Sequence, residues 1–70
     1  MTLAEYVAHL DDIGNADAER TLITIERIRR AYLDRMDRQF ADSTVTIESG
    51  QLCIDIAPDV TLIEIGEFPE

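Results

Sequence analysis

Lysine and tryptophan are absent from this 70-residue chain, which also holds only one cysteine, two prolines and three glycines. The single cysteine, Cys53, excludes an intrachain disulfide. No apolar run approaches the about 18 residues that a transmembrane helix needs, and no signal peptide opens the sequence. We therefore expect a soluble protein of the cytoplasm.

Positive charge is confined to one segment of the chain. All six basic residues are arginines between Arg20 and Arg38, against fifteen acids, and the net charge is −9. Residues 41–70 contain seven of these acids and no base. The resulting negative field attracts cationic partners and repels free nucleic acid and anionic membranes. We therefore expect a protein partner with a basic surface, and no direct contact with nucleic acid or membrane.

The length allows one domain, covering residues 1–70, and no internal repeat divides it. A domain of this size buries only about 60% of the surface of its unfolded chain and is marginal alone. Its net charge adds self-repulsion. Association with a second copy or with a partner would bury more surface, so a homodimer is one expectation.

Two helices are predicted in the first half of the chain. Thr2 and Glu5 form a capping-box pattern before the first helix, and Gly14 is typical of a helix end. This predicts a helix over about residues 3–12. Beyond Gly14, apolar residues recur every three or four positions without glycine or proline. This predicts a second, longer helix over about residues 16–40.

Three strands are predicted in the second half, where the apolar period changes to two. They cover about residues 44–48, 51–57 and 60–66. Ser49-Gly50 and Pro58-Asp59 supply two-residue turns between them. The whole pattern predicts an α+β domain of two layers. An N-terminal helical hairpin, a short helix and then a long one, packs on a three-stranded antiparallel β-meander.

The two predicted turns also set the register of the strands. The first turn pairs Glu48 with Gln51, and the second pairs Ala57 with Val60. When the second pairing is continued along the strands, Ile63 lies on the face that packs against the helices. Both hairpins then place their isoleucines on this one face, and that agreement supports the meander.

The opposite face of the predicted sheet has no remaining element to cover it. Acidic side chains recur along it around a small apolar centre, an arrangement that suits a modest protein interface. Any solvated sheet face alternates in a similar way, so an ordinary surface is the alternative. The outer strands also leave open backbone edges for a second copy or a partner. The residues expected to bind a partner are Asp42, Glu48, Asp55, Asp59, Leu62 and Glu64.

Two residues break the pattern of the long helix. Arg29 lies in the middle of its apolar stripe. One interpretation is a stem that packs on the core while its guanidinium pairs with Asp42 or Glu67. The other is an interface arginine. Ile23 is the converse, an apolar residue on the polar side, where it could join a second contact patch with the arginines beside it.

Few residues suggest chemistry. Glu5, His9 and Asp12 share one side of the first helix and could hold a metal, but a surface ion-pair cluster is the more usual result of such spacing. Cys53 has no predicted neighbour that would activate it as a nucleophile. No Ser-His-Asp set, phosphate-binding glycine loop or dinucleotide fingerprint occurs. We therefore expect neither an enzyme nor a metal or cofactor site.

One segment carries a resemblance to a known class. Residues 40–51 read FADSTVTIESGQ and residues 54–59 read IDIAPD. This stretch resembles the acidic β-hairpin segments of small phage-encoded anti-CRISPR proteins. The resemblance implies a stoichiometric inhibitor that occupies the basic nucleic-acid-binding surface of a CRISPR effector complex in the host cytoplasm, with carboxylates in the place of phosphates. The alternative is a homo-oligomeric structural or adaptor protein whose acidity serves solubility.

Overall fold

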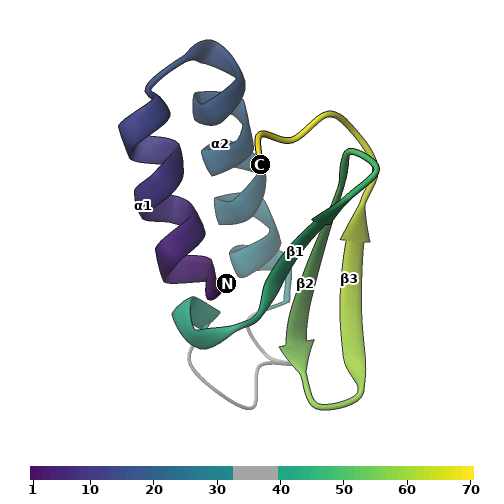
Figure 1. Ribbon diagram of the computed structural model, residues 1–70. Helices are drawn as coiled ribbons and strands as arrows, with labels where there is room; N and C mark the ends of the chain where they lie inside the picture. Colours follow the sequence, from purple (N-terminus) through teal and green to yellow (C-terminus); the bar gives the residue numbers. More distant parts are fainter. Residues whose placement is uncertain (33–39) are drawn as a thin grey trace.

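The computed structural model of the protein describes residues 1–32 and 40–70. Two helices come first, followed by a short 3-10 turn, η2, and then an antiparallel sheet of order β1-β2-β3. Figure 1 shows the helices as one layer and the sheet as the other. The predicted α+β fold is therefore confirmed. The elements are α1 (Leu3–Ile13), α2 (Ala16–Ala31), η2 (Phe40–Asp42), β1 (Val45–Glu48), β2 (Gln51–Ala57) and β3 (Val60–Glu64).

Local capping fixes the start of both helices. The Glu5 main-chain N–H donates to the Thr2 hydroxyl at 3.2 Å, and the Glu5 carboxylate accepts from the Thr2 N–H at 2.9 Å. This is the predicted capping box. Gly14 closes α1 with a φ of 64°, and the side chain of Asn15 accepts from the N–H of Ala18 to begin α2. The tight joint brings the two helices side by side (Figure 1).

The second helix is shorter than predicted. It ends at Ala31, and its cap, Tyr32, has a φ of −118° and a ψ of 17°. Phe40 belongs to η2 and not to this helix. The rest of the predicted helix, residues 33–39, lies outside the described residues. No glycine or proline marks the helix end, so apolar spacing alone could not locate it.

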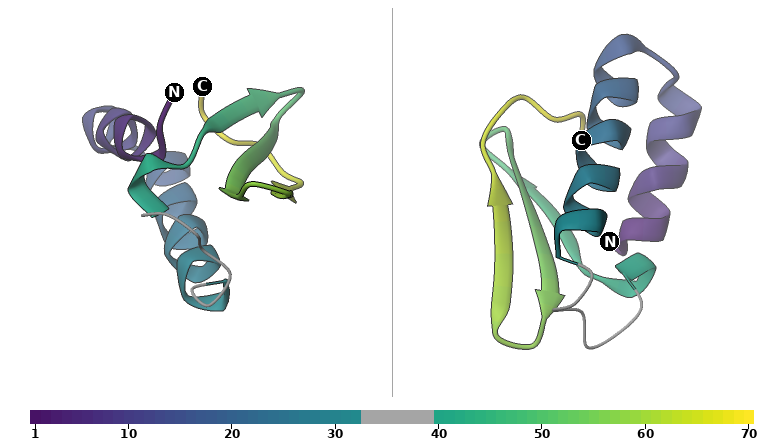
Figure 2. Two further views of the ribbon diagram at one scale, coloured as in Figure 1. Left: turned by 90° about the horizontal axis from the view of Figure 1, so that it is seen from below. Right: turned by 180° about the vertical axis from the view of Figure 1, so that it is seen from behind.

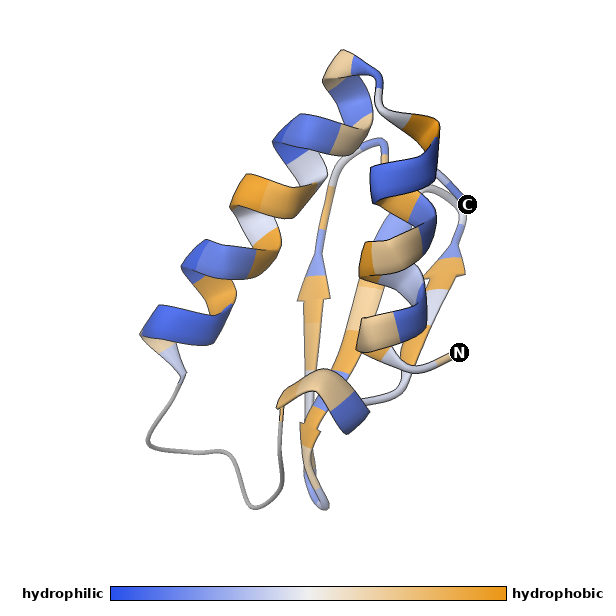
Figure 3. Cartoon of the chain, turned by 90° about the vertical axis from the view of Figure 1, so that its left-hand side faces the viewer, coloured by the Kyte–Doolittle hydropathy of each residue, from blue (hydrophilic) through white to orange (hydrophobic). Residues whose placement is uncertain are grey.

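The core lies between the two layers. Leu52 and Ile54 of β2 are fully buried against apolar side chains of both helices, including Tyr6 and Ile25. Figure 3 shows apolar bands along the helices and along the strands behind them. Each buried side chain of this size contributes roughly 1.5–3 kcal/mol relative to an exposed one.

The first hairpin has the predicted register. Glu48 pairs with Gln51, and the pairing continues in phase along β1 and β2. The turn residues Ser49 and Gly50 have φ values of 51° and 80°. Positive φ at both positions is the geometry of a type I′ turn, which matches the twist of the strands. A Cβ atom at Gly50 would also lie 3.1 Å from the main-chain oxygen of Gly66. Both the positive φ and this close approach therefore disfavour a side chain at this position.

The second hairpin departs from the predicted register by one residue. Ala57 pairs with Val60 as predicted. Further along, however, Ile54 pairs with Leu62 and not with Ile63. The prediction for β3 is therefore wrong beyond its first residue, and every later side chain of this strand faces the other way.

The cause of the shift is a β-bulge at Ile56. The register breaks between Asp55 and Ala57, and Ile56 and Ala57 are both buried, which regular alternation does not allow. Pro58 begins the turn, and its ring holds φ near −65°. A type I′ turn, which needs positive φ at both positions, is therefore closed to this hairpin. The bulge supplies the extra residue and the extra twist instead.

The segment after β3 returns to the helices. Figure 1 shows it passing from the far end of β3 back to the helical layer. The Tyr6 hydroxyl donates to the main-chain oxygen of Pro69 at 2.6 Å, and His9 Nε2 lies 2.7 Å from the main-chain oxygen of Glu70. Phe68 packs half-buried against the core. Burial raises the pKa of Tyr6 to about 12.

Candidate functional site

The bulge exchanges the two faces of β3. Leu62 now packs against the core, and Glu64 faces α2. Ile63 and Ile65 point away from the helices and are 55% and 83% exposed. The predicted placement of Leu62 and Glu64 on the uncovered face is therefore wrong, because it depended on the unbulged register.

Glu64 is neutralised by a cation from the helical layer. Arg27 Nη2 donates to Glu64 Oε1 at 2.6 Å, and the Glu64 side chain is 30% exposed. This contact joins the C-terminal half of α2 to the end of β3. Glu64 therefore adds little to the negative field outside the sheet.

The uncovered face of the sheet, called the outer face below, has a central row across all three strands. Thr46 pairs with Cys53, and Cys53 pairs with Ile63. The alternation of the strands places the other members on the same side. The outer face consists of Thr46, Glu48, Gln51, Cys53, Asp55, Thr61, Ile63 and Ile65.

Acidic residues lie at both ends of the outer face. At one end, Asp55 accepts from the Thr61 hydroxyl at 2.6 Å, and exposed Asp59 lies in the following turn. At the other end, Glu48 precedes the Ser49-Gly50 turn. Exposed Glu67 lies at the margin of this end, beyond the bend at Gly66, where it also lines the cleft toward α2. Cys53 and Ile63 of the central row lie between these ends, and Ile65 follows Ile63 on the same side; these three residues are called the apolar row below. Predicted residues Glu48, Asp55 and Asp59 are thus brought together around it.

Asp42 lies elsewhere. It belongs to η2, which precedes β1 and contacts α1. The predicted grouping of Asp42 with the acids of the sheet is therefore not found. Exposed Glu67 follows β3, as its position in the sequence indicates.

Every arginine of the described residues pairs with an acid away from the outer face. Within α2, Arg20 pairs with Asp17, and Arg30 with Glu26 at 3.3 Å. Arg27 reaches Glu64 on the inner side of β3. The two helical pairs join residues three and four positions apart. Arg35 and Arg38 lie outside the described residues.

Arg29 also stays on its own helix. Its Nη2 and Nε donate to the two carboxylate oxygens of Glu26 at 2.6 and 3.1 Å. The hydrogen bond from Arg29 lowers the pKa of Glu26 below its usual value. The expected pairing of Arg29 with Asp42 or Glu67 is wrong, since a neighbour three residues away satisfies the guanidinium first. Its side chain is 43% exposed.

The candidate metal ligands of α1 and the thiol of Cys53 are not arranged as a metal or nucleophile site. Glu5 is engaged by the helix cap and His9 by Glu70, and the described residues contain no group of three side chains that could hold a metal. Cys53 is half-buried between Thr46 and Ile63, neither of which is a base. Ile23 is 70% exposed and lines a shallow depression with neighbouring residues of α2.

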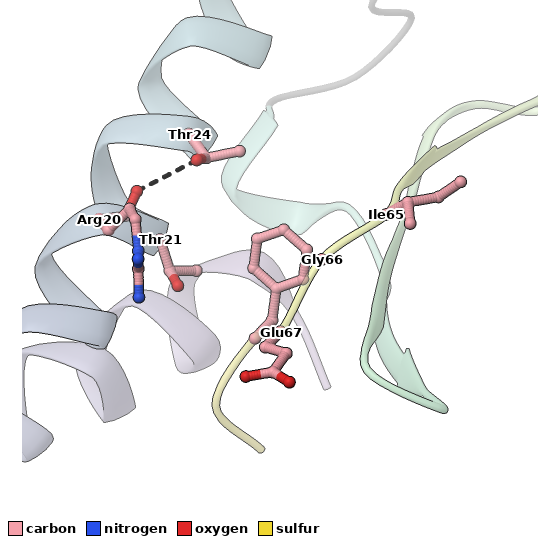
Figure 4. A pocket seen from close by; sticks show the side chains of 7 residues that line it. Arg20, Thr21, Thr24, Ile65, Gly66 and Glu67 are labelled. Carbon is pink, nitrogen blue, oxygen red and sulfur yellow. Dashed lines mark hydrogen bonds between the residues drawn. The ribbon is translucent and has the colours of Figure 1, made fainter.

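A cleft of about 390 Å³ separates α2 from residues 65–68. Figure 4 shows Arg20, Thr21 and Thr24 on its helical wall. The Thr21 and Thr24 hydroxyls donate to main-chain oxygens one turn earlier, at 2.8 and 3.1 Å, and Arg20 pairs with Asp17. The polar groups of the helical wall are therefore already satisfied within the helix.

Comparisons of the chain with protein-family models, curated proteins and solved structures each gave no match. The resemblance to anti-CRISPR hairpins therefore stays a prediction. In the described part of the chain, neither helix has the length and apolar character needed to cross a membrane. The candidate functional site is therefore the outer face, with its apolar row and its acids at both ends.

Proposed function

We propose that this protein is a non-catalytic binding module that docks a basic protein surface on its outer face. The observation that carries the proposal is the separation of charge. Glu48 and Asp55 lie on an uncovered face, and the arginines of the described residues are paired elsewhere. A cationic partner can therefore approach this face without meeting a base. Such complementarity speeds association and selects the partner.

The apolar row supports docking rather than mere solubility. Ile63 and Ile65 leave more than half of their surface exposed on a small protein. Protein interfaces typically combine an apolar centre with a polar rim. A partner that covered both isoleucines would gain apolar burial, and its basic residues would meet the acids at either end.

We propose further that the partner is a nucleic-acid-binding complex, such as a CRISPR effector, and that the protein inhibits it. Duplex DNA carries one charge per about 1.7 Å of its axis, and proteins that bind it display rows of cations. Carboxylates gathered on one sheet face would compete for these cations. The protein would then act as a stoichiometric inhibitor and nucleic-acid mimic.

Capture experiments with charge-reversed variants test the proposal. The variant Glu48→Lys with Glu67→Lys alters the outer face and its margin. The matched control, Asp11→Lys with Asp12→Lys, makes the same change in net charge on exposed positions of α1. We expect a nucleic-acid-binding complex to be captured at low salt, to be lost at high salt, and to be lost with the first variant only.

Equal loss with both variants would show that bulk charge alone attracts the partner. Capture unaffected by either variant would contradict docking on this face. The same variants, added to a nuclease or DNA-binding assay of the captured complex, would separate inhibition from binding without inhibition.

The second candidate is a homo-oligomeric structural or adaptor protein with acidity serving solubility. The observation that favours it is the exposure of Ile63 on the outermost strand and of Ile65 just beyond its end. Sedimentation velocity over a wide concentration range tests it. A dimer that persists at low concentration, with no cationic partner captured, would select this candidate.

A further inference from the structure

The two edges of the sheet differ in whether they are occupied. Beside β1, the main-chain N–H of Val45 donates to the Met1 oxygen at 2.7 Å, and Thr2 bridges to Thr44. The first residues of the chain thus cover the start of this edge. In the two views of Figure 2 and in Figure 1, β3 is the outermost strand. No segment of the described residues pairs with its second edge.

The sequence of β3 does nothing to block strand pairing. Natural edge strands are usually protected by proline, lysine, a bulge or an inward charge. The run Val60–Glu64 holds no proline or lysine, and the bulge of this hairpin lies in β2. Its one charge, on Glu64, is neutralised by Arg27. The free edge is therefore competent to accept another strand.

A groove beside β3 provides space for the side chains of an added strand. It lies between α2 and β3, has a volume of about 250 Å³, and is lined in part by Ile28, Tyr32 and Leu62. A fourth strand would lie about 4.8 Å beyond β3 and would extend over this groove. Every second side chain of that strand would enter the groove, and the alternate ones would flank Ile63 and Ile65.

The charges at the ends of β3 select a partner over a second copy. Asp59 precedes the strand, and Glu67 follows it. At each end of an antiparallel pair of two copies centred on Ile63, Asp59 of one copy would approach the segment around Gly66 and Glu67 of the other, and two chains of net charge −9 would be brought together. Like charges placed opposite each other destabilise a strand pair. A segment with a base at each end would replace both repulsions with attractions.

We infer that the partner binds by strand addition, through an extended segment with alternating apolar residues and a basic residue at each end that pairs with the free edge of β3. This inference rests on the proposed function and names the kind of segment that the basic partner contributes. It predicts main-chain hydrogen bonds to β3 in addition to charge attraction.

Peptides test the inference on the full chain. The probe is the capped peptide KKVTVTVKK, and the readout is amide hydrogen exchange and chemical shift across β3. Two derivatives carry N-methyl groups on alternate residues, so that each loses the N–H donors of one edge. Because only one edge of the peptide can face β3, we expect one derivative to bind at least about tenfold more weakly and the other to bind like the parent. The β3 amides should be protected by the parent.

Charge controls complete the design. The peptide EEVTVTVEE should not bind, and Asp59→Asn with Glu67→Gln should weaken the parent peptide about tenfold. The matched pair Asp11→Asn with Asp12→Asn should change its affinity less than about twofold. These variants keep the volume of each side chain, so the fold should not be affected.

The outcomes separate the inference from the proposed function. If neither the parent peptide nor a scrambled basic peptide binds at low salt, the proposed function itself fails. If both N-methylated derivatives bind like the parent and the shifts lie around Glu48 and Asp55, the docking face stands and strand addition is overturned. Protection of β3 that grows with protein concentration without peptide would assign the edge to a second copy, which also overturns the inference.

Discussion

Arg27 of α2 and Glu64 of β3 lie in contact, with 2.6 Å between Nη2 and Oε1. Among the ion pairs of the described residues, this one joins the helical layer to the sheet. It also removes Glu64 from the acids that a partner could use. The contact therefore has a larger effect on where exposed negative charge lies than on the stability of the fold.

The first prediction concerns this pair. The Arg27 side chain is 69% exposed, and exposed ion pairs contribute about 0.2–1 kcal/mol. A double-mutant cycle with Arg27→Ala and Glu64→Gln, measured by urea unfolding, should give a coupling energy in this range. Glu64→Gln should also leave partner capture intact, whereas Glu48→Gln should weaken it. A coupling above about 2 kcal/mol, or equal effects on capture, would contradict this interpretation.

The second prediction tests the bulged register. Ile56 is fully buried at the bulge, so Ile56→Ala should lower the free energy of unfolding by about 2–5 kcal/mol. Ile65 is 83% exposed, so Ile65→Ala should change it by less than about 0.5 kcal/mol. Denaturant unfolding of both variants measures the difference. A large loss for Ile65→Ala would instead support a strand with Ile65 turned toward the core.

The contrast between the two hairpins explains how much of the fold could be predicted. Ser49-Gly50 can adopt positive φ at both turn positions, so a local signal determined the register of β1 and β2. Pro58 cannot, and the resulting bulge reflects a conflict between turn geometry and strand twist. No residue pattern marks where a strand will absorb such a conflict. A single extra residue then reverses every later side chain.

The same contrast applies to the residues of the candidate site. Glu48 and Asp55 lie on strands whose register followed from the type I′ turn, and both were placed correctly on the outer face. Leu62 and Glu64 lie beyond the bulge, and both were placed on the wrong side. Arg29 found its partner, Glu26, within one turn of its own helix, because nearby charges compete more effectively than distant ones.

The third prediction is a loss of stability at alkaline pH through Tyr6. Its pKa is raised from 10.0 to about 12 by burial, and its hydroxyl donates to Pro69. Because the pKa is higher in the folded state, the contribution is complete below pH 10 and is lost as the pH rises toward 12. Thermal unfolding of the protein from pH 8 to 12 should show this loss.

Tyr6→Phe provides the control for that measurement. Removal of the hydroxyl leaves the Pro69 oxygen without this donor, and the variant should be about 1–2 kcal/mol less stable at neutral pH. It should also show a smaller decrease in stability between pH 10 and 12 than the unmodified protein. The same alkaline loss in both proteins would show that Tyr6 is not its source.

The fourth prediction concerns salt. With a net charge of −9, repulsion among the acids opposes folding, while the ion pairs that salt would weaken are largely exposed and contribute little. Raising the KCl concentration shortens the Debye length from about 10 Å at 0.1 M to about 3 Å at 1 M. Stability should therefore rise with KCl. Thermal unfolding of Asp11→Asn with Asp12→Asn should show a weaker rise, since that variant begins with less repulsion. A fall in stability with KCl would mean that the ion pairs, and not the repulsion among the acids, dominate the electrostatics of folding.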